Sequence, residues 1–296
     1  MIINQQALVT LNTGFSAAFN KGFTGVQPRY TKIATTVPSS TADQKYAWIG
    51  NFPKMREWIG ERTIQNIAAY DYTVKNKKFE STIAVSRDEI EDDQYGIYAP
   101  MVTALGQEAA KHPDDLVFKA MRNGFEQTCY DGKPFFSTDH KNGGYAYSNK
   151  GTEKLSQESY AAARASMMGI LSDNGDSLGL VPDLLVVSPA NEEKALMILK
   201  ADYINGTTNV YKGTAEILVV PELAAMPEVW FLFCTSMFLK PFIYQERKKI
   251  KFVSLTKETD MNVFLKDEYV YGADGRCNVG YGFPQMAYGS TGEAQG

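Results

Sequence analysis

Hydrophobic and polar side chains alternate one by one through much of residues 46–85, which is the clearest pattern in the chain. Two alternating runs, 64–74 and 79–85, are separated by the polar sequence Lys75-Asn76-Lys77. Alternation with a period of two is typical of strands that have one buried face. We therefore predict a long two-stranded hairpin that turns at 75–77. Because an isolated two-stranded ribbon is only marginally stable, this hairpin is expected to pack on another surface.

A long helix is predicted after the hairpin. Ser86-Arg87-Asp88-Glu89 has the spacing of a capping box and should open a short helix first. From Ile97 to Ala120 apolar residues then recur every four positions, which predicts one core-facing stripe. The whole helix would contain about 28 residues and be about 40 Å long. Pro113 should either kink it or restart it, and the pattern ends near Gly124.

The first 45 residues are rich in polar side chains. The spacing of their apolar residues predicts a short helix over 7–19. The stretch 21–44 contains two prolines and shows no sustained period, which predicts an extended arm. An arm of this kind usually needs another surface to lie on.

The second half of the chain alternates between apolar strands and helices. Helices are predicted from a cap at Ser156 and from Ser188-Pro189 to Lys200, and buried strands at 184–187, 217–220 and 229–234. Together these elements predict a compact α/β subdomain between about 176 and 245. From residue 249 onward the β pattern returns, with long strands joined at the turn Gly272-Ala273-Asp274-Gly275.

Composition excludes several classes of protein. Of 296 residues, 44% are hydrophobic and 22% are charged, which is typical of a globular protein and argues against disorder. The net charge of −4 excludes a dedicated basic nucleic-acid binder. Neither a signal peptide nor an apolar stretch of about 20 residues that would cross a bilayer is evident. We therefore expect an intracellular product without a membrane segment.

Cysteine and histidine offer little sign of catalytic chemistry. The three cysteines, Cys129, Cys234 and Cys277, are widely spaced and odd in number, so a reducing compartment fits better than a disulfide framework. A cysteine hydrolase using Cys129 and His140 is one alternative, but nothing near them indicates an activated thiol. His112 lies on the apolar stripe and has no metal-ligand partner at suitable spacing. We expect no catalytic residue, cofactor or metal.

One basic cluster stands out. Arg247, Lys248, Lys249 and Lys251 follow one another closely at the start of the last β region. Such a cluster can contact phosphate groups, here those of DNA, or it can form a solvated strand face. The sequence leaves both alternatives open.

The order of these elements, together with several short segments, resembles the HK97-like major capsid proteins of tailed bacteriophages, and among them the Mu-like major head subunit (T protein) family. The segments that carry the resemblance are Ala47-Trp48-Ile49-Gly50, Met55-Arg56-Glu57-Trp58, Gly60-Glu61-Arg62, Lys78-Phe79-Glu80, Asp131-Gly132-Lys133-Pro134-Phe135-Phe136-Ser137-Thr138-Asp139-His140, Tyr271-Gly272-Ala273-Asp274-Gly275-Arg276 and Gly280-Tyr281-Gly282-Phe283. No single segment is diagnostic, but their order along nearly the whole chain is.

The resemblance implies an α+β fold with five parts. These are an N-terminal arm (1–45), an extended E-loop (46–85), a peripheral domain with the long spine helix (86–175), an axial α/β domain (176–245) and returning peripheral strands (246–296). The E-loop would lie over a neighbouring subunit. We expect Trp48, Arg56, Glu57, Trp58 and Arg62 to contact that neighbour, because buried Trp and Arg anchors dominate interfaces.

The resemblance also implies a function and partners. Copies would assemble as hexamers and pentamers into an icosahedral phage head that encloses double-stranded DNA. The partners would be a portal protein, a decoration protein and a separate scaffolding protein, since the arm begins at Met1. Assembly would take place in the bacterial cytoplasm and the product would be part of the virion. An encapsulin-like shell that stores an enzyme is the alternative with the same fold.

Overall fold

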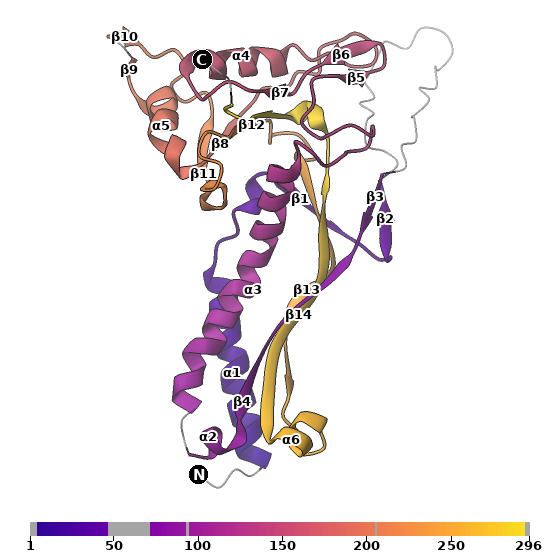
Figure 1. Cartoon of the computed structure of the whole chain (residues 1–296), viewed down its shortest axis with the longest axis vertical. Coiled ribbons are helices and arrows are strands. Elements are labelled where there is room, and N and C mark those ends of the chain that lie inside the picture. The colour runs from indigo at the N-terminus through magenta and orange to yellow at the C-terminus, as the bar shows by residue number, and fades with distance from the viewer. Residues whose placement is uncertain (1–4, 47–71, 93–94, 205, 294–296) are drawn as a thin grey trace.

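Two long antiparallel strands, β13 (Phe242–Leu255) and β14 (Glu268–Tyr281), form the axis of the computed structural model. The structure describes residues 5–46, 72–92, 95–204 and 206–293. At one end of the axis lies an α/β body, and the long strands and two helices extend away from it (Figure 1). The mixture of helices and strands agrees with the predicted α+β class.

The long sheet combines strands from distant parts of the sequence. Its order is β1-β13-β14-β4. β1 (Ala34–Pro38) runs parallel to the start of β13, and β4 (Lys77–Ser86) pairs antiparallel with β14. The predicted arm therefore contributes an edge strand to the chain's own sheet.

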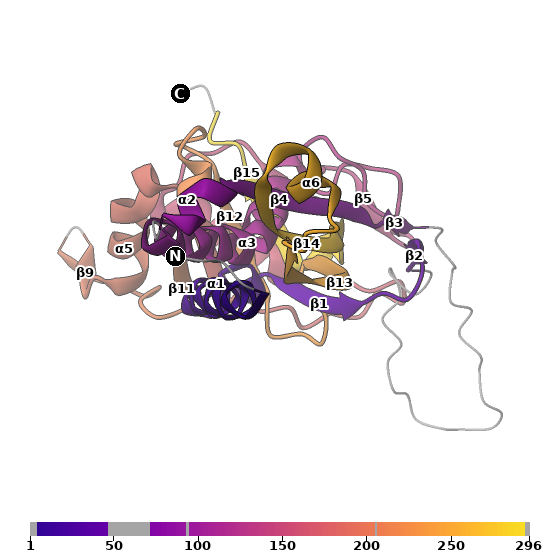
Figure 2. The ribbon, with the colours of Figure 1, turned by 90° about the horizontal axis from the view of Figure 1, so that it is seen from below.

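Two helices, α1 (Gln5–Gly25) and α3 (Tyr95–Asn123), lie side by side and cover one face of this sheet (Figure 2). The length of α3, 29 residues, agrees with the predicted length of about 28, whereas α1 is longer than the sequence predicts. α1 continues six residues past the predicted end at residue 19, because it packs along α3 instead of lying on a neighbour. Its Phe15 and Phe19 are buried against Val102 and Leu105 of α3 and against Tyr271 of the sheet.

The core-facing stripe of α3 differs from the predicted one. Pro113 lies inside a continuous helix and does not restart it. Ile97 and Met101, which the four-residue spacing places in the core, are 68% and 38% exposed. A helix has 3.6 residues per turn, so positions four apart drift around its axis. The buried hydrophobic side chains of α3 are Val102, Leu105, Ala110, Val117, Phe118 and Met121.

The predicted hairpin turn at 75–77 is wrong. β3 (Thr73–Lys75) pairs with β2 (Asp43–Lys45), whereas β4 begins at Lys77 and pairs with β14. Asn76 is buried between them, and its amide donates to Ser39 Oγ and Thr41 O. Asn is common in turns, so the sequence favoured a turn here. Asn76 can instead be buried because its side chain is hydrogen-bonded. Residues 47–71, which join β2 to β3, lie outside the described residues.

The predicted turn at 272–275 is also wrong, since β14 runs straight through it. Its glycines meet close neighbours: a Cβ atom at Gly272 would lie 2.8 Å from Ser81 O, and one at Gly275 would lie 2.7 Å from Ile250 Cγ1. Glycine is used where another strand approaches closely. The reversal before β14 is made instead by α6 (Met261–Lys266) and by Asp267, whose φ is 55°.

The α/β body is built on a five-stranded sheet with the order β11-β8-β12-β15-β7. The strands are β11 (Glu216–Val219), β8 (Leu184–Val187), β12 (Trp230–Phe233), β15 (Ala287–Ser290) and β7 (Lys150–Gly151). The predicted strands at 184–187, 217–220 and 229–234 are confirmed within a residue or two. β7 and β15 lie outside the predicted 176–245 range, and they complete the same sheet.

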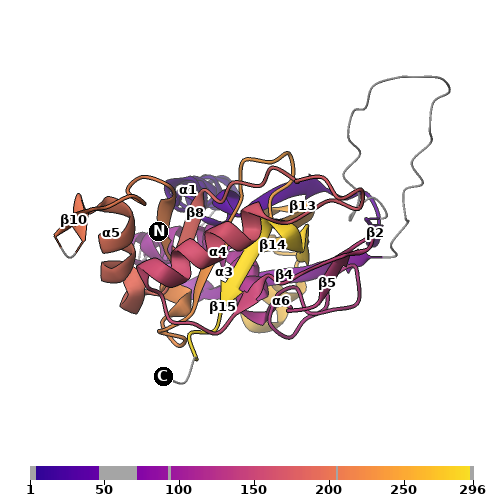
Figure 3. The same ribbon diagram turned by 90° about the horizontal axis from the view of Figure 1, so that it is seen from above.

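Helices α4 (Gln157–Met168) and α5 (Glu192–Lys200) cover the outer face of this sheet (Figure 3). The predicted cap at Ser156 is confirmed: its hydroxyl accepts from the Ser159 amide, and the Ser159 side chain completes the capping box. The opposite face packs Phe231 and Phe233 against the end of α3. The α/β body and the long sheet therefore share a continuous core.

The remaining elements are short. They are α2 (Arg87–Glu91), β5 (His140–Asn142), β6 (Tyr145–Tyr147), β9 (Tyr203–Ile204), β10 (Thr207–Thr208) and the 3-10 turns at 30–32, 189–191, 221–223 and 284–286. Ser86 stands at the N-cap of α2 as predicted, but its side chain makes no capping hydrogen bond. In the described ranges no helix is both long and apolar enough to span a bilayer.

Candidate functional site

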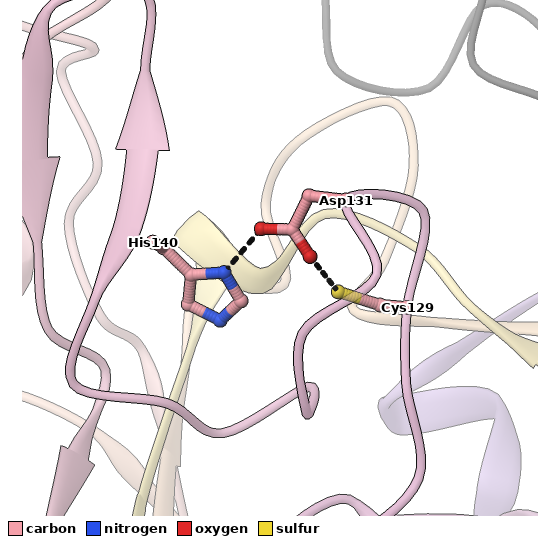
Figure 4. Close-up of side chains that lie close together, drawn as sticks. All are labelled: Cys129, Asp131 and His140. Atoms are coloured by element: carbon pink, nitrogen blue, oxygen red, sulfur yellow. Dashed lines mark hydrogen bonds and ion pairs between the residues drawn. The ribbon is translucent and has the colours of Figure 1, made fainter.

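Cys129, Asp131 and His140 lie together between the end of α3 and the α/β body (Figure 4). The Cys129 thiol donates to Asp131 Oδ1 at 3.1 Å, and His140 Nδ1 lies 2.6 Å from Asp131 Oδ2. The second ring nitrogen, Nε2, lies 3.2 Å from the carbonyl oxygen of Phe135. His140 and Cys129 are buried. The carboxylate, and not the imidazole, is thus the hydrogen-bond partner of the thiol.

This geometry does not activate the thiol. Burial, together with the adjacent Asp131 carboxylate, raises the pKa of Cys129 far above its usual range. Burial also opposes ionisation of Asp131, but hydrogen bonds from His140, the Lys133 amide and Cys129 outweigh it and hold the pKa of that carboxyl below its usual value. A nucleophilic cysteine needs a neighbouring base or cation that favours the thiolate. The hydrolase alternative therefore has no support in this site.

The segment around this cluster is part of the core. Phe135 and Phe136 are fully buried, and Phe135 stacks on Tyr281 of β14 with ring centroids 4.7 Å apart. Asn149 holds the segment in place: its amide donates to the carbonyl oxygens of Phe135 and Pro284. The aromatic pair thus fills the junction between the long sheet and the α/β body.

A buried polar network holds the base of the segment 47–71. The Tyr46 hydroxyl donates to Gln245 Oε1 at 2.9 Å, and Gln245 Nε2 donates to Asn76 Oδ1 at 2.8 Å and to Val74 O at 3.1 Å. These groups join β2, β3 and β13. The described residues on either side of 47–71 are therefore held together by Gln245. The predicted contact residues Trp48, Arg56, Glu57, Trp58 and Arg62 lie outside the described residues.

The predicted basic cluster lies on β13, where Arg247, Lys248, Lys249 and Lys251 are all exposed. Lys248 forms an ion pair with Asp274. Strand register adds two basic residues that sequence reasoning missed, since Lys248, Arg276 and Lys78 stand opposite one another across β13, β14 and β4. Only the pairing of three distant strands brings them together, so no local sequence signal would have found them.

Comparison with known proteins places the chain in a family. The family model for the Mu-like prophage major head subunit gpT matches residues 8–153, 142–223 and 224–295. The major capsid protein of Escherichia phage Mu is 32% identical over 293 residues, 99% of this chain and 76% of that protein. The chain belongs to the Mu-like gpT major head subunit family.

A second relative and a solved capsid structure agree with this assignment. The Mu-like prophage FluMu major head subunit of Haemophilus influenzae is 35% identical over 96% of this chain and 72% of its own length. The procapsid subunit of bacteriophage JBD30 has a TM-score of 0.63 and 35% identity, covering 99% of this chain and 77% of that chain. The HK97-like fold and the family predicted from the sequence are confirmed. These matches do not favour the encapsulin-like or hydrolase alternatives.

The gpT-like fold leaves large apolar side chains exposed at both ends. Met261, Phe264 and Leu265 of α6 are exposed at the tip of the long sheet, and Phe264 reaches 78%. Tyr203 and Val210 are exposed at the far end of the α/β body. Exposed apolar groups of this size usually mark surfaces that other chains cover. The pattern of apolar and polar residues in the sequence did not distinguish these exposed apolar side chains from buried ones.

Proposed function

We propose that this chain is the structural major capsid protein of a Mu-like phage, and that copies assemble as hexamers and pentamers into an icosahedral head around double-stranded DNA. The observation that carries the proposal is the match to a procapsid subunit along 99% of the chain, from α1 to β15. As a structural subunit, the chain is proposed to have no catalytic activity of its own.

The parts of the fold suit this role. We assign the long sheet with α1 and α3 to the peripheral domain, with α3 as the spine helix, and the α/β body to the axial domain. Because β4 belongs to the long sheet, the proposed E-loop is the segment 47–71, which joins β2 to β3 and is shorter than the predicted 46–85. The arm is then the stretch up to β2, which packs on the chain's own α3 and β13.

Contacts between copies are proposed at two kinds of surface. Trp48, Arg56, Glu57, Trp58 and Arg62 of the E-loop would anchor one subunit on the next, because aromatic and Arg side chains contribute most to interfaces. The exposed apolar groups of α6 offer a second contact. In a closed shell many copies of modest contacts act together, so no single interface has to be strong.

The basic surface on β13, β14 and β4 is proposed to contact packaged DNA without sequence specificity. Lys and Arg side chains on phosphates supply this kind of affinity. The other proposed partners are a separate scaffolding protein, a portal protein and a decoration protein. Assembly is proposed to occur in the host cytoplasm, and the finished shell belongs to the virion.

Electron microscopy of the purified full chain, alone and mixed with the scaffolding protein of the same phage, tests the proposal. We expect closed shells of uniform size in at least one condition. A protein that stays monomeric in both conditions, as judged by light scattering, would overturn it.

A further inference from the structure

The cluster of Cys129, Asp131 and His140 has the donor set of a metal site. One sulfur, one carboxylate oxygen and one ring nitrogen all lie within 4.8 Å of one another, and the residues that supply them are buried or half-buried. Thiolate and imidazole are ligands that zinc prefers, whereas magnesium and calcium prefer oxygen alone. The donor chemistry therefore selects zinc.

The orientation of the His140 ring is that of a metal ligand. Phe135 contributes a carbonyl oxygen, which can only accept, so Nε2 carries the hydrogen at 3.2 Å. In the neutral ring this leaves the lone pair on Nδ1, directed at Asp131 Oδ2 only 2.6 Å away. Two acceptors at this distance need a positive charge between them, either a proton or a metal ion. A backbone carbonyl that fixes the tautomer in this way is typical of metal-bound histidines.

A fourth polar group lies beside the cluster. The ring of Tyr147 stacks on His140 with centroids 5.2 Å apart. Its hydroxyl is buried and lies close to the side chain of Tyr130. The three ligand atoms leave the fourth position of a tetrahedral zinc site to a water molecule.

We propose that each chain binds one zinc ion through Cys129 Sγ, an Asp131 carboxylate oxygen and His140 Nδ1. Binding releases the thiol proton, and any proton held between Nδ1 and Asp131, to solvent. The thiolate and the carboxylate together balance the two positive charges of zinc, so the buried site is neutral. The ion would join residue 129 to β5 and close the loop that carries Phe135 and Phe136 into the core. This inference does not rest on the proposed function.

Cobalt substitution gives a direct test, because a thiolate bound to Co²⁺ produces a sulfur-to-metal charge-transfer absorption. The purified full chain is treated with a chelator, dialysed and titrated with Co²⁺ and then with Zn²⁺. We expect the band to saturate at one Co²⁺ per chain, to disappear when Zn²⁺ is added, and to be absent in Cys129→Ser. Cys234→Ser is the matched control, since Cys234 is also a buried free cysteine, and it should keep the band.

Metal content supplies a measurement that does not depend on the variants. The wild-type protein, purified without chelator, should contain close to one zinc per chain by mass spectrometry, and added Zn²⁺ should raise its Tm after chelation. A wild-type chain that binds neither zinc nor cobalt would overturn the proposal, and so would a charge-transfer band that persists in a folded Cys129→Ser protein. In the first case hydrogen bonds alone hold the cluster together, and in the second another cysteine binds the metal.

Discussion

Gly106 of α3 lies against the carbonyl oxygen of Phe19 in α1, so closely that a Cβ atom at position 106 would come within 2.2 Å of that oxygen. The relation is reciprocal, because a Cβ atom at Gly22 of α1 would lie 2.0 Å from the carbonyl oxygen of Thr103. The two helices therefore pack backbone to backbone at this crossing, which only glycine allows.

Replacing Gly106 by alanine should destabilise the protein by about 1–3 kcal/mol, because the two helices must move apart to admit the methyl group. The free energy of unfolding from urea denaturation measures this. Gly14→Ala is the matched control: this glycine of α1 has open space around it, so the substitution should be neutral or stabilising by up to about 1 kcal/mol. Equal effects of the two substitutions would contradict the close packing.

Replacing Gln245 by leucine should cost about 1–3 kcal/mol of stability, because buried partners are left without hydrogen bonds. Gln245 is fully buried and bonds with Tyr46, Asn76 and Val74. Gln107→Leu, at an exposed position of α3, should change stability by less than about 0.5 kcal/mol. Urea denaturation of both variants is the measurement. Shell assembly should also suffer in Gln245→Leu alone, since this network fixes the base of segment 47–71.

Acid should destabilise the protein partly through His112. Burial lowers the pKa of this residue, whose Nε2 has no partner in the described structure, although the charge of Asp115 partly offsets the effect. The unfolded chain then binds a proton that the folded chain resists, so stability falls as the pH drops through about 6.5. His112→Phe should keep the ring contact with Phe79, whose centroid lies 4.2 Å away, and remove this loss.

The measurement for His112 is Tm at about pH 7.5 and about pH 5, a range in which an ordinary histidine changes charge. The Tm of wild type should fall more than that of His112→Phe over this interval. Parallel decreases in the two proteins would show that this histidine does not contribute to acid sensitivity.

Trp58→Ala should leave a folded subunit that assembles poorly, because we propose Trp58 as an anchor between neighbouring subunits. Circular dichroism and Tm should match wild type, whereas the yield of shells by electron microscopy should fall. Lys119→Ala, at an exposed position of α3, serves as a control and should assemble normally. Shells of wild-type yield from Trp58→Ala would remove this residue from the proposed interface.

Reversing the charge of Lys249 and Lys251 together should weaken binding of the subunit to double-stranded DNA. The slope of log affinity against log salt should decrease by about 0.9 for each phosphate that the variant no longer neutralises, or about 2 for both. Fluorescence anisotropy with a short duplex measures both the affinity and the slope. The double variant Lys119→Glu with Lys200→Glu carries the same change of charge at other exposed positions, and an identical decrease of affinity there would point to net charge alone.

The sequence predicted those helices and strands in which apolar and polar residues follow one regular pattern from end to end. The apolar strands of the α/β body, the helix capped by Ser156 and the long helix that ends near Gly124 all follow from local spacing. It failed where residues owe their position to a distant strand. Asn76 and Gly272 are turn residues by composition, but hydrogen bonds and close packing across the sheet place them in extended segments.

The candidate sites were predictable to different degrees. The basic cluster on β13 was visible as a run of Lys and Arg, but its extension to Arg276 and Lys78 depends on strand register. The sequence suggested Cys129 and His140 as a pair in the hydrolase alternative, but the position of Asp131 between them depends on how the segment 129–140 folds back. Side chains that meet only because an irregular segment folds back on itself leave no periodic pattern in the sequence, so their contacts could not be predicted from it.

The register of the long sheet also sets the order of events during synthesis. Its outer strands, β1 and β4, are made within the first 86 residues, and their partners, β13 and β14, only after residue 241. The early strands can pair only after residues 242–281 have been synthesised, because they are separated from their partners by more than 150 residues of sequence. A nascent chain thus presents no finished surface for another copy to recognise, and association is delayed until translation has passed residue 281.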